Sequence, residues 1–583
     1  MLRSSGGGVV IREWHARKAK PAADHSDSAR GPSVVSALVT LSVAFTTVAA
    51  ASGALPPVEA GGTVQDYVLP VLFGGQVTNN WGMLLGLSAW RSLVPLGGLA
   101  MYCLAVICSL TRSYGWLAAG GVALMAVTRI DHSYFEFTEG YYLYLGARIA
   151  DGATLYRDLP STQAPLLPVL ISGLWRLDED VFLTRLFATG CFLLAAALSG
   201  WLAVRLTGRR AAGPLATLMA AVLPLGASNP QILDANAVLA PLGVGVALLS
   251  LGGPMAAGAS GIIAAFGIGT KLTFTPVAIA PLAGWLLAGW LLARTRRQPD
   301  ATSHAVWLSF GVSLTAGLVL LAGVTYLDAG PNARDALWGE LDSPMLPAGA
   351  ALAALQFVQL EGLALVLAGA GWWRYRLDRR LAPAAAMAVT AVLFPLFAIH
   401  QGTFVSVARP AEPLIAAYAA AGILALPTLL ARFRALAPSL LLALPPMATA
   451  LVVALALMQS LTSAAPPVVV PVADFAGDEM VLIPPFLAAT THRRIAGDYA
   501  DWTAWGRRAR AGREPERDDA RRLVAALERG ALPVVIADFR LSYVPGANDA
   551  LQRSYIRVAG DETAGGSAVA LYLPRARDTT GAR

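Results

Sequence analysis

The chain has 583 residues, of which 56% are hydrophobic and only 14% are charged. Soluble domains carry about 25% charged residues, so this composition, with a mean hydropathy of +0.57, excludes an ordinary soluble protein and predicts many membrane spans. The formal net charge of +7 comes mostly from arginines in short loops, and the sequence carries no nucleic-acid-binding motif. The three cysteines lie inside apolar runs, so we expect no disulfide framework.

Residues 1–33 are polar and basic, and the apolar run 34–55 that follows predicts a first, uncleaved span; a cleaved signal peptide is the alternative. The runs 93–110 and 115–128 predict two more spans. Further apolar runs recur at 181–204, 211–228, 236–251, 255–270, 273–293, 304–326, 349–371, 382–399, 411–430 and 438–461. Each is near the ~20 residues that cross hydrocarbon, and together the runs predict about thirteen transmembrane helices.

Arginines are concentrated in alternate short connections between these runs. With a cytoplasmic N-terminus, the cytoplasmic connections hold Arg112, Arg205, Arg209, Arg210, Arg294, Arg296, Arg297, Arg374, Arg376, Arg379, Arg380, Arg432 and Arg434. The other connections are poorer in basic residues, which is the positive-inside pattern. This pattern places the stretch 129–176, Asp234, Lys271 and the segments 327–347 and 400–409 outside. An odd number of spans places the C-terminus outside as well.

Residues 462–583 are polar and predict a small α/β unit after the last span. They contain β-like runs at MVLIPPF, LPVVIADF and VALYLP, and the helical pattern DDARRLVAALERG precedes the second run. Strand–helix–strand order is typical of a small α/β domain. A unit of this length is exported despite its arginines, so we expect it outside the membrane.

Acidic and aromatic residues gather in the stretch 129–176, between two apolar runs. Glu139, in Phe-Thr-Glu-Gly-Tyr-Tyr just beyond a span, is the first candidate for a general base. A carboxylate there can accept a proton from a hydroxyl while it stays near a lipid headgroup. Glu136 and Asp131 are competing candidates. The alternative for these acids is that they only solvate a loop.

Two more residues of this stretch are candidates for substrate binding. Tyr142 has three tyrosines nearby in the sequence and is suited to stacking on a sugar face; an aromatic belt at the membrane surface is the alternative. Arg157 is the second candidate, and its alternative role is to tie the loop together with Asp158.

Three charged residues elsewhere fall in exterior connections. Lys271, in FGIGTKLTFTP, has no neighbouring acid, and a lone lysine at membrane depth is a functional candidate. Its ammonium would neutralise a phosphate leaving group; a snorkelling lysine is the alternative. The functional role of Asp234 would be to bind sugar hydroxyls or to assist Glu139, and its alternative role is to cap the helix that follows it. Arg409, beside Pro410 and Glu412, would pair with phosphate or with Glu412.

Several other classes of site leave no trace in the sequence. It has no GxxxxGK[ST], HExxH or GxSxG motif and no paired cysteine ligands. The histidines His132, His400 and His492 are scattered and give no metal-ligand spacing.

The segments EGYYLYLGARIADG at 139–152, LYRD at 155–158, APLLP at 164–168 and GTKLT at 269–273 resemble motifs of the GT-C membrane glycosyltransferases. The most similar groups are the aminoarabinose transferases of lipid A, the rhizobial lipopolysaccharide galacturonosyltransferases and the dolichyl-phosphate-mannose protein mannosyltransferases. The chain departs from the family at Thr138, where an acid is usual, and at Ala164, where a proline is usual.

The resemblance implies an all-α polytopic membrane protein of the GT-C type in the cell inner membrane. It implies a cytoplasmic tail (1–33), two extra helices (34–114), a catalytic core (115–461) whose first exterior loop is 129–180, and an extracytoplasmic α/β domain (462–583). It also implies inverting transfer of a sugar from a polyprenyl-phosphate donor to an envelope lipid, polysaccharide or protein on the exterior face.

In such a reaction Glu139 would act as the base, Lys271 with Arg409 would hold the departing polyprenyl phosphate, and Asp234 would orient a substrate. We expect no cofactor; if a divalent metal binds, Glu139 and Asp234 are candidate oxygen ligands. A transporter or flippase of lipid-linked glycans is the main alternative. An inactive relative that acts as a binding protein is another, because Thr138 replaces an acid.

Overall fold

The computed structural model describes residues 137–179, 181–223, 231–294, 301–334, 347–375, 381–397, 405–430, 485–490, 492, 494–495, 514–533, 535–537, 541, 544–559 and 570–575. The predicted spans 34–55, 93–110, 115–128 and 438–461 lie outside these residues, as do Asp131 and Glu136.

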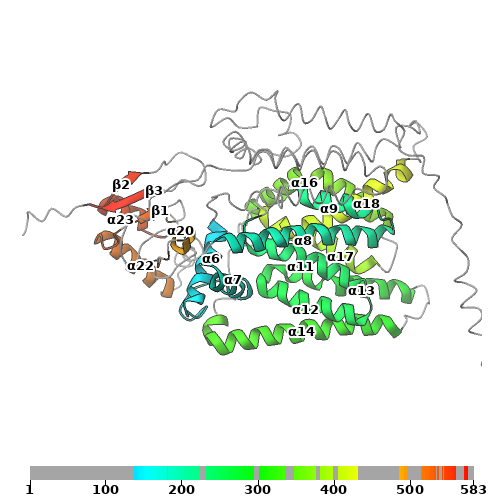
Figure 1. The fold of residues 1–583 in the computed structure, drawn as a ribbon, viewed down its shortest axis with the longest axis horizontal. Helices are drawn as coiled ribbons and strands as arrows, with labels where there is room; N and C mark the ends of the chain where they lie inside the picture. The colour runs from blue at the N-terminus through cyan, green and yellow to red at the C-terminus, as the bar shows by residue number, and fades with distance from the viewer. Residues whose placement is uncertain are drawn as a thin grey trace, which may run out of the picture.

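Between residues 181 and 430 the described chain forms a bundle of apolar helices (Figure 1). These are α8 (Val181–Thr207), α9 (Ala212–Val222), α11 (Ala235–Ser250), α12 (Pro254–Thr270), α13 (Thr275–Arg294), α14 (Ala301–Ala329), α16 (Pro347–Tyr375), α17 (Ala382–Phe397) and α18 (Glu412–Leu430). Two 3-10 helices, η3 (Leu272–Phe274) and η6 (Val405–Ala411), precede α13 and α18. Each apolar run predicted between 181 and 430 overlaps one of these helices.

Length and composition alone qualify two of the described helical segments, Val181–Thr207 and His304–Ala329, to cross a membrane, and shorter apolar helices accompany them. Exposed leucine, valine and tryptophan side chains cover the outer faces of several helices, as at Trp201, Leu286 and Leu320. The predicted all-helical core is therefore confirmed for the described residues. The count of about thirteen transmembrane helices stays a prediction.

Helix pairs that are joined by short connections, such as α8 and α9, α11 and α12, and α12 and α13, pack side by side and alternate in direction. The N-terminal ends of α8, α11, α13 and α18 therefore meet the C-terminal end of α12 at one end of the bundle. Helices α6 (Phe137–Ala150) and α7 (Leu166–Leu177) lie against this end (Figure 1). We refer to it as the α6 end; Arg209 and Arg210 lie at the opposite end.

The stretch 129–176 is not the loop that we expected from its polar residues. Helices α6 and α7 take up most of its described part and pack on each other. The tyrosines of α6 point inward, because Tyr141 is hydrogen-bonded to Ser161 at 2.7 Å and Tyr142 donates to Gln163 Oε1 at 3.1 Å. The segment is therefore a compact unit with its own core.

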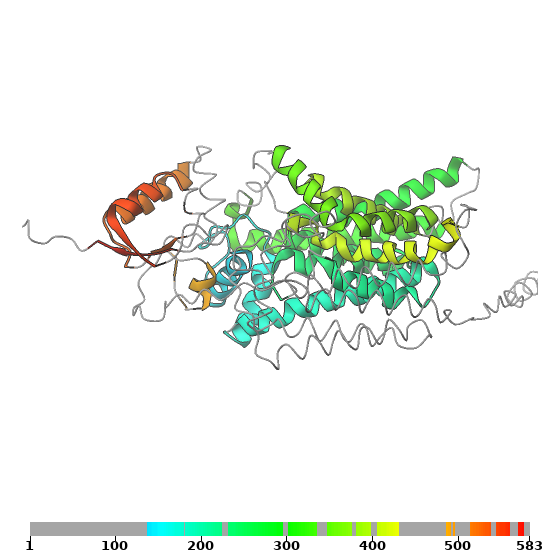
Figure 2. The same ribbon diagram turned by 90° about the horizontal axis from the view of Figure 1, so that it is seen from above.

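The C-terminal residues form a small α/β unit beyond the α6 end, as Figure 2 shows from above. Its sheet has the order β1-β3-β2 and is antiparallel, with β1 (Val535–Ala537), β2 (Tyr555–Ala559) and β3 (Ala570–Pro574). Helices α22 (Glu514–Glu528) and α23 (Ala547–Ser554) pack together beside it. Two predicted strands and the predicted helix are present. The prediction of a strand at 480–486 is wrong for its last two residues, because α20 (Pro485–Thr490) begins there.

The C-terminal segment also contacts the helical part directly. Helix α20 packs on α6, and the Ile495 amide donates to the Tyr144 hydroxyl at 3.1 Å, where both groups are buried. His492 lies 6.1 Å from the Trp175 ring of α7. The described parts before and after the bundle therefore meet at the same end of it.

Helices α16 and α18 make the closest helix crossing in the bundle. A Cβ built on Gly371 would lie 2.0 Å from the Tyr418 carbonyl oxygen, and one on Gly422 would lie 1.9 Å from that of Leu367. Only glycine allows two helix backbones to approach so closely. Helix α17 connects α16 to α18 and packs on both, so α16 and α18 run in the same direction.

Substitution Gly371→Ala will lower the unfolding midpoint of the purified protein in mild detergent. The added methyl meets backbone atoms, and overpacking of this kind costs about 1–3 kcal/mol. The control is Gly369→Ala in the same helix, where nothing lies within 4 Å of the new Cβ. This control will be neutral or slightly stabilising; equal effects of the two substitutions would contradict the close crossing.

Candidate functional site

Glu139 lies in the first turn of α6 and is completely buried. Its two carboxylate oxygens accept hydrogen bonds from Arg185 Nε at 3.0 Å and Arg185 Nη2 at 2.9 Å. This bidentate geometry is the strong form of an arginine–carboxylate pair. We expected an accessible carboxylate at the membrane surface, and the structure places it instead in a buried ion pair.

Arg185 is the site residue that the sequence reading missed. It lies in the second turn of α8 and is 4% exposed. The signal was present, because an arginine inside an apolar run is expensive unless it is paired. Hydropathy averaged over the run 181–204 conceals one charged residue among so many apolar ones.

Burial and the hydrogen-bond partners of Glu139 shift the pKa of its carboxyl in opposite directions. Desolvation raises the pKa of Glu139 above its ordinary value, while the Arg185 guanidinium and a hydrogen bond from the Leu233 backbone lower it. The nearby Asp234 carboxylate raises it further. These contributions show that Glu139, Arg185 and the segment before α11 form one electrostatic unit.

Asp234 caps the N-terminus of α11, as one of its two predicted roles required. Its Oδ1 accepts from the Ala237 amide at 2.7 Å and lies 3.5 Å from Arg409 Nη1. Its Oδ2 accepts from Asn236 Nδ2 at 2.9 Å. An acid at this position satisfies a free helical N–H and interacts favourably with the helix dipole. The ion pair also ties α11 to η6, more than 170 residues later in the chain.

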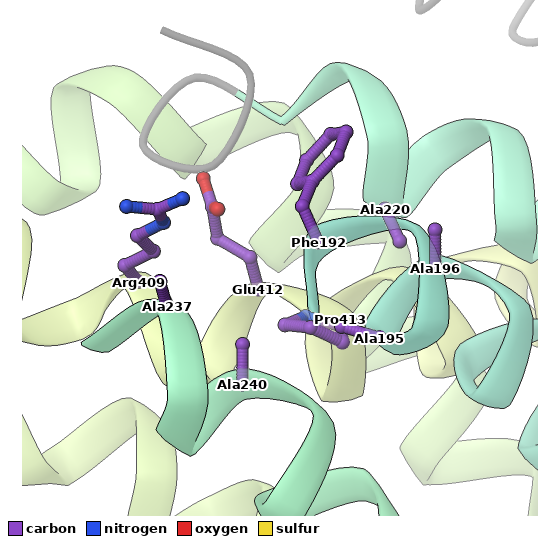
Figure 3. Close-up of a pocket in the computed structure, with 9 residues that line it drawn as sticks. All are labelled: Phe192, Ala195, Ala196, Ala220, Ala237, Ala240, Arg409, Glu412 and Pro413. Atoms are coloured by element: carbon purple, nitrogen blue, oxygen red, sulfur yellow. The ribbon is translucent and has the colours of Figure 1, made fainter. Parts of the chain in front are cut away.

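Arg409 and Glu412 line a small cavity at the α6 end (Figure 3). Its empty volume, which includes its opening, is about 280 Å³, and Phe192, Pro413 and several alanines form the rest of the wall. Figure 3 shows the polar ends of Arg409 and Glu412 pointing to the same side. Both residues are more than 90% buried, so the charged part of this wall is shielded from bulk water.

Lys271 ends α12 and begins η3 at the same end of the bundle. It is partly exposed, and among the described residues it has no ion pair or side-chain hydrogen bond. A second cavity, with an empty volume of about 310 Å³, is lined by Thr273 and Phe274 of this segment and by Pro410. The segments that carry Lys271 and Arg409 therefore border one space.

Two predicted substrate contacts have other partners. Tyr142 is 2% exposed and points into the α6–α7 core, so no face of its ring is open. Arg157 is exposed and contacts Asp158 at 3.0 Å and the Thr154 hydroxyl at 2.6 Å. Its guanidinium lowers the pKa of the Asp158 carboxyl to about 2. Among the described residues no cluster of three potential metal ligands occurs.

No protein-family model matches the sequence, and no curated protein is significantly similar to it. Solved structures are similar. ArnT from Cupriavidus metallidurans in the apo state matches with a TM-score of 0.54 at 16% identity, covering 79% of this chain and 98% of ArnT. The chain has the fold of ArnT.

ArnT bound to undecaprenyl phosphate matches with a TM-score of 0.51, at 16% identity and with the same coverage. The apo oligosaccharyltransferase of Archaeoglobus fulgidus gives 0.48 at 13% identity, covering 80% of this chain and 75% of that one. ArnT is a lipid A aminoarabinose transferase of the GT-C type, so the resemblance expected from the sequence is confirmed for the fold. At 16% identity the likeness to ArnT concerns the fold alone.

Removing one partner of the Glu139–Arg185 pair will destabilise the protein strongly. Glu139→Gln and Arg185→Met each leave a buried group uncompensated, which costs about 3–5 kcal/mol. The double variant Glu139→Leu/Arg185→Met will cost less than the sum of the two single changes, because it removes both charges. Unfolding midpoints of the three variants in detergent measure the coupling.

The matched control is Arg553→Ala, which breaks an exposed pair with Glu528 whose atoms are 2.7 Å apart. Exposed pairs contribute at most about 1 kcal/mol, so this variant will stay close to wild type. Strict additivity of the Glu139 and Arg185 substitutions would show that the buried pair does not couple α6 to α8.

Proposed function

We propose that the protein is an integral membrane glycosyltransferase that transfers a sugar from a polyprenyl-phosphate donor to an envelope lipid, polysaccharide or protein. The proposal is supported by the fold of ArnT, which has itself been crystallised with undecaprenyl phosphate. The observation that carries it is the collection of charged residues at the α6 end, where Lys271 and Arg409 lie in segments that border one cavity. The active face is the exterior face of the inner membrane.

Lys271 is the group that we assign to the donor phosphate. Its ammonium has no described acidic partner, so its charge remains available to an anion. The phosphate gains negative charge as it leaves the sugar, and a fixed cation beside it stabilises that transition state. Arg409 is already paired with Asp234, so we assign it to hold η6 against α11 and only secondarily to the phosphate.

The base must accept the proton of the acceptor hydroxyl while that oxygen attacks the anomeric carbon. The bond from this carbon to the phosphate oxygen then breaks, and the polyprenyl phosphate departs with the electron pair. Both oxygens of Glu139 are occupied by Arg185, so Glu139 would have to leave its partner to act. We therefore assign proton transfer to Glu136 or Asp131 and give Glu139 a positioning role.

Purified protein in liposomes, supplied with a panel of radiolabelled polyprenyl-phosphate sugars and envelope extracts, tests the assignment. Lys271→Ala will lower transfer by about 10²-fold or more, and Lys271→Arg will retain part of the rate. Asp131→Asn and Glu136→Gln will separate the two acids, and loss of the base costs about 10²–10⁴-fold. A loss of rate at an unchanged unfolding midpoint identifies the base, whereas Glu139→Gln will lower rate and midpoint together.

The control variant is again Arg553→Ala, which lies in the C-terminal unit and will transfer at the wild-type rate. Neither transfer nor donor hydrolysis with any donor, combined with movement of a lipid-linked glycan across the bilayer, would replace the enzyme with a transporter. Full activity of Lys271→Ala would remove the proposed phosphate ligand.

A further inference from the structure

Glu361 is an acid without a donor in the middle of a helix bundle. It lies at the midpoint of α16 and is 1% exposed. Among the described residues, neither of its carboxyl oxygens has a hydrogen-bond donor. A buried carboxylate in that condition is very unfavourable unless another species neutralises it. The position therefore requires a ligand or a proton.

The described side chain that interacts with the Glu361 carboxyl is that of Glu412. Glu412 is the first residue of α18 and is also 1% exposed. The glycine crossing places the two acids at the same height independently, because Glu361 precedes Leu367 and Glu412 precedes Tyr418 by the same number of residues. Two carboxylates have no proton to donate, so their contact becomes a hydrogen bond only when one of them is protonated.

No other described charged or polar group forms a hydrogen bond with Glu361. Arg409 of η6 lines the same cavity as Glu412, but it is also paired with Asp234. Tyr418 of α18 is buried, and its hydroxyl has no partner among the described residues. The residues of α17 whose side chains are described include no titratable group. None of these described groups pairs with Glu361, so its carboxyl lies in a buried place without a described cation.

We propose that Glu361 and Glu412 share one proton in the folded protein and form a proton-binding site between α16 and α18. The pair holds one negative charge in place of two, in the manner of carboxyl dyads whose members lie too close to ionise together. Glu412 presents its part of the pair to the cavity beside Arg409, so the proton sets the charge of that wall. The proposal does not depend on glycosyl transfer.

The sign of the pH dependence follows from proton binding. At neutral pH a glutamate in the unfolded chain is ionised, whereas the folded pair retains a proton, so the folded state binds more protons. Stability then decreases as pH rises. The loss begins above the ordinary glutamate range and continues through the pH at which the pair releases its proton.

Two measurements on purified protein in detergent test the site without any substrate. Infrared spectra at neutral pH will show the absorption of a protonated carboxylic acid in the wild type, and Glu361→Gln will lose it. Unfolding midpoints from pH 6 to pH 9 will fall for the wild type and stay nearly level for Glu361→Gln, which mimics the protonated acid. Glu412→Gln is the second variant, used if Glu361→Gln fails to fold.

The control is Glu528→Gln, an exposed acid in the C-terminal unit, which will leave both the absorption and the pH profile unchanged. An identical pH profile in wild type and Glu361→Gln, or no carboxylic-acid absorption in the wild type, would overturn the proposal. If that absorption is missing and the midpoint instead rises with added sodium or magnesium ions, a bound cation replaces the proton. Loss of transfer activity alone would leave the proposed proton site unaffected.

Discussion

The arrangement of the α6 end depends on the pairing of Glu139 with Arg185. These side chains come from two helices, and each is too costly to bury without the other. Their contact fixes the start of α6 against the second turn of α8, and the Leu233 backbone joins the same unit. Through the neighbouring Asp234 the arrangement continues to α11 and η6. Four separate parts of the chain are thus held together by two ion pairs and a backbone hydrogen bond at one end of an otherwise apolar bundle.

The helices of the bundle could be predicted from the sequence because each coincides with an apolar run that hydropathy alone identifies. A run of about 20 apolar residues forms a helix where water is absent, because a helix satisfies its backbone N–H and C=O groups within the segment. The cap at Asp234 was equally readable, since an aspartate just before an apolar run is a local signal. What could not be read was α6: its segment FTEGYYLYLGARIA does not separate apolar from polar residues into two faces, so the sequence does not show which sides are buried. Those sides are buried by α7, α20 and α8, which lie elsewhere in the sequence.

In the candidate site, too, the sequence identified single residues but not their partners from distant parts of the chain. Lys271 was identified by its isolation in the sequence, and it lies at the end of α12. The partners of Glu139 and Tyr142 were not identifiable, because Arg185 and Gln163 are chosen by packing rather than by spacing. Glu361 is an acid inside the apolar run 349–371, but its companion Glu412 belongs to another helix. Single residues were found from sequence, and pairs required coordinates.

The hydrogen bond from the Ile495 amide to Tyr144 gives the C-terminal unit a mechanical connection to the bundle. Tyr144 stands little more than one turn after Glu139 on the same short helix, and a helix of that length moves as a rigid rod. A macromolecule that binds the β1-β3-β2 sheet and tilts it would therefore displace α6, the helix that carries Glu139. A displacement of the C-terminal unit would in this way be passed through Tyr144 to the pair of Glu139 with Arg185.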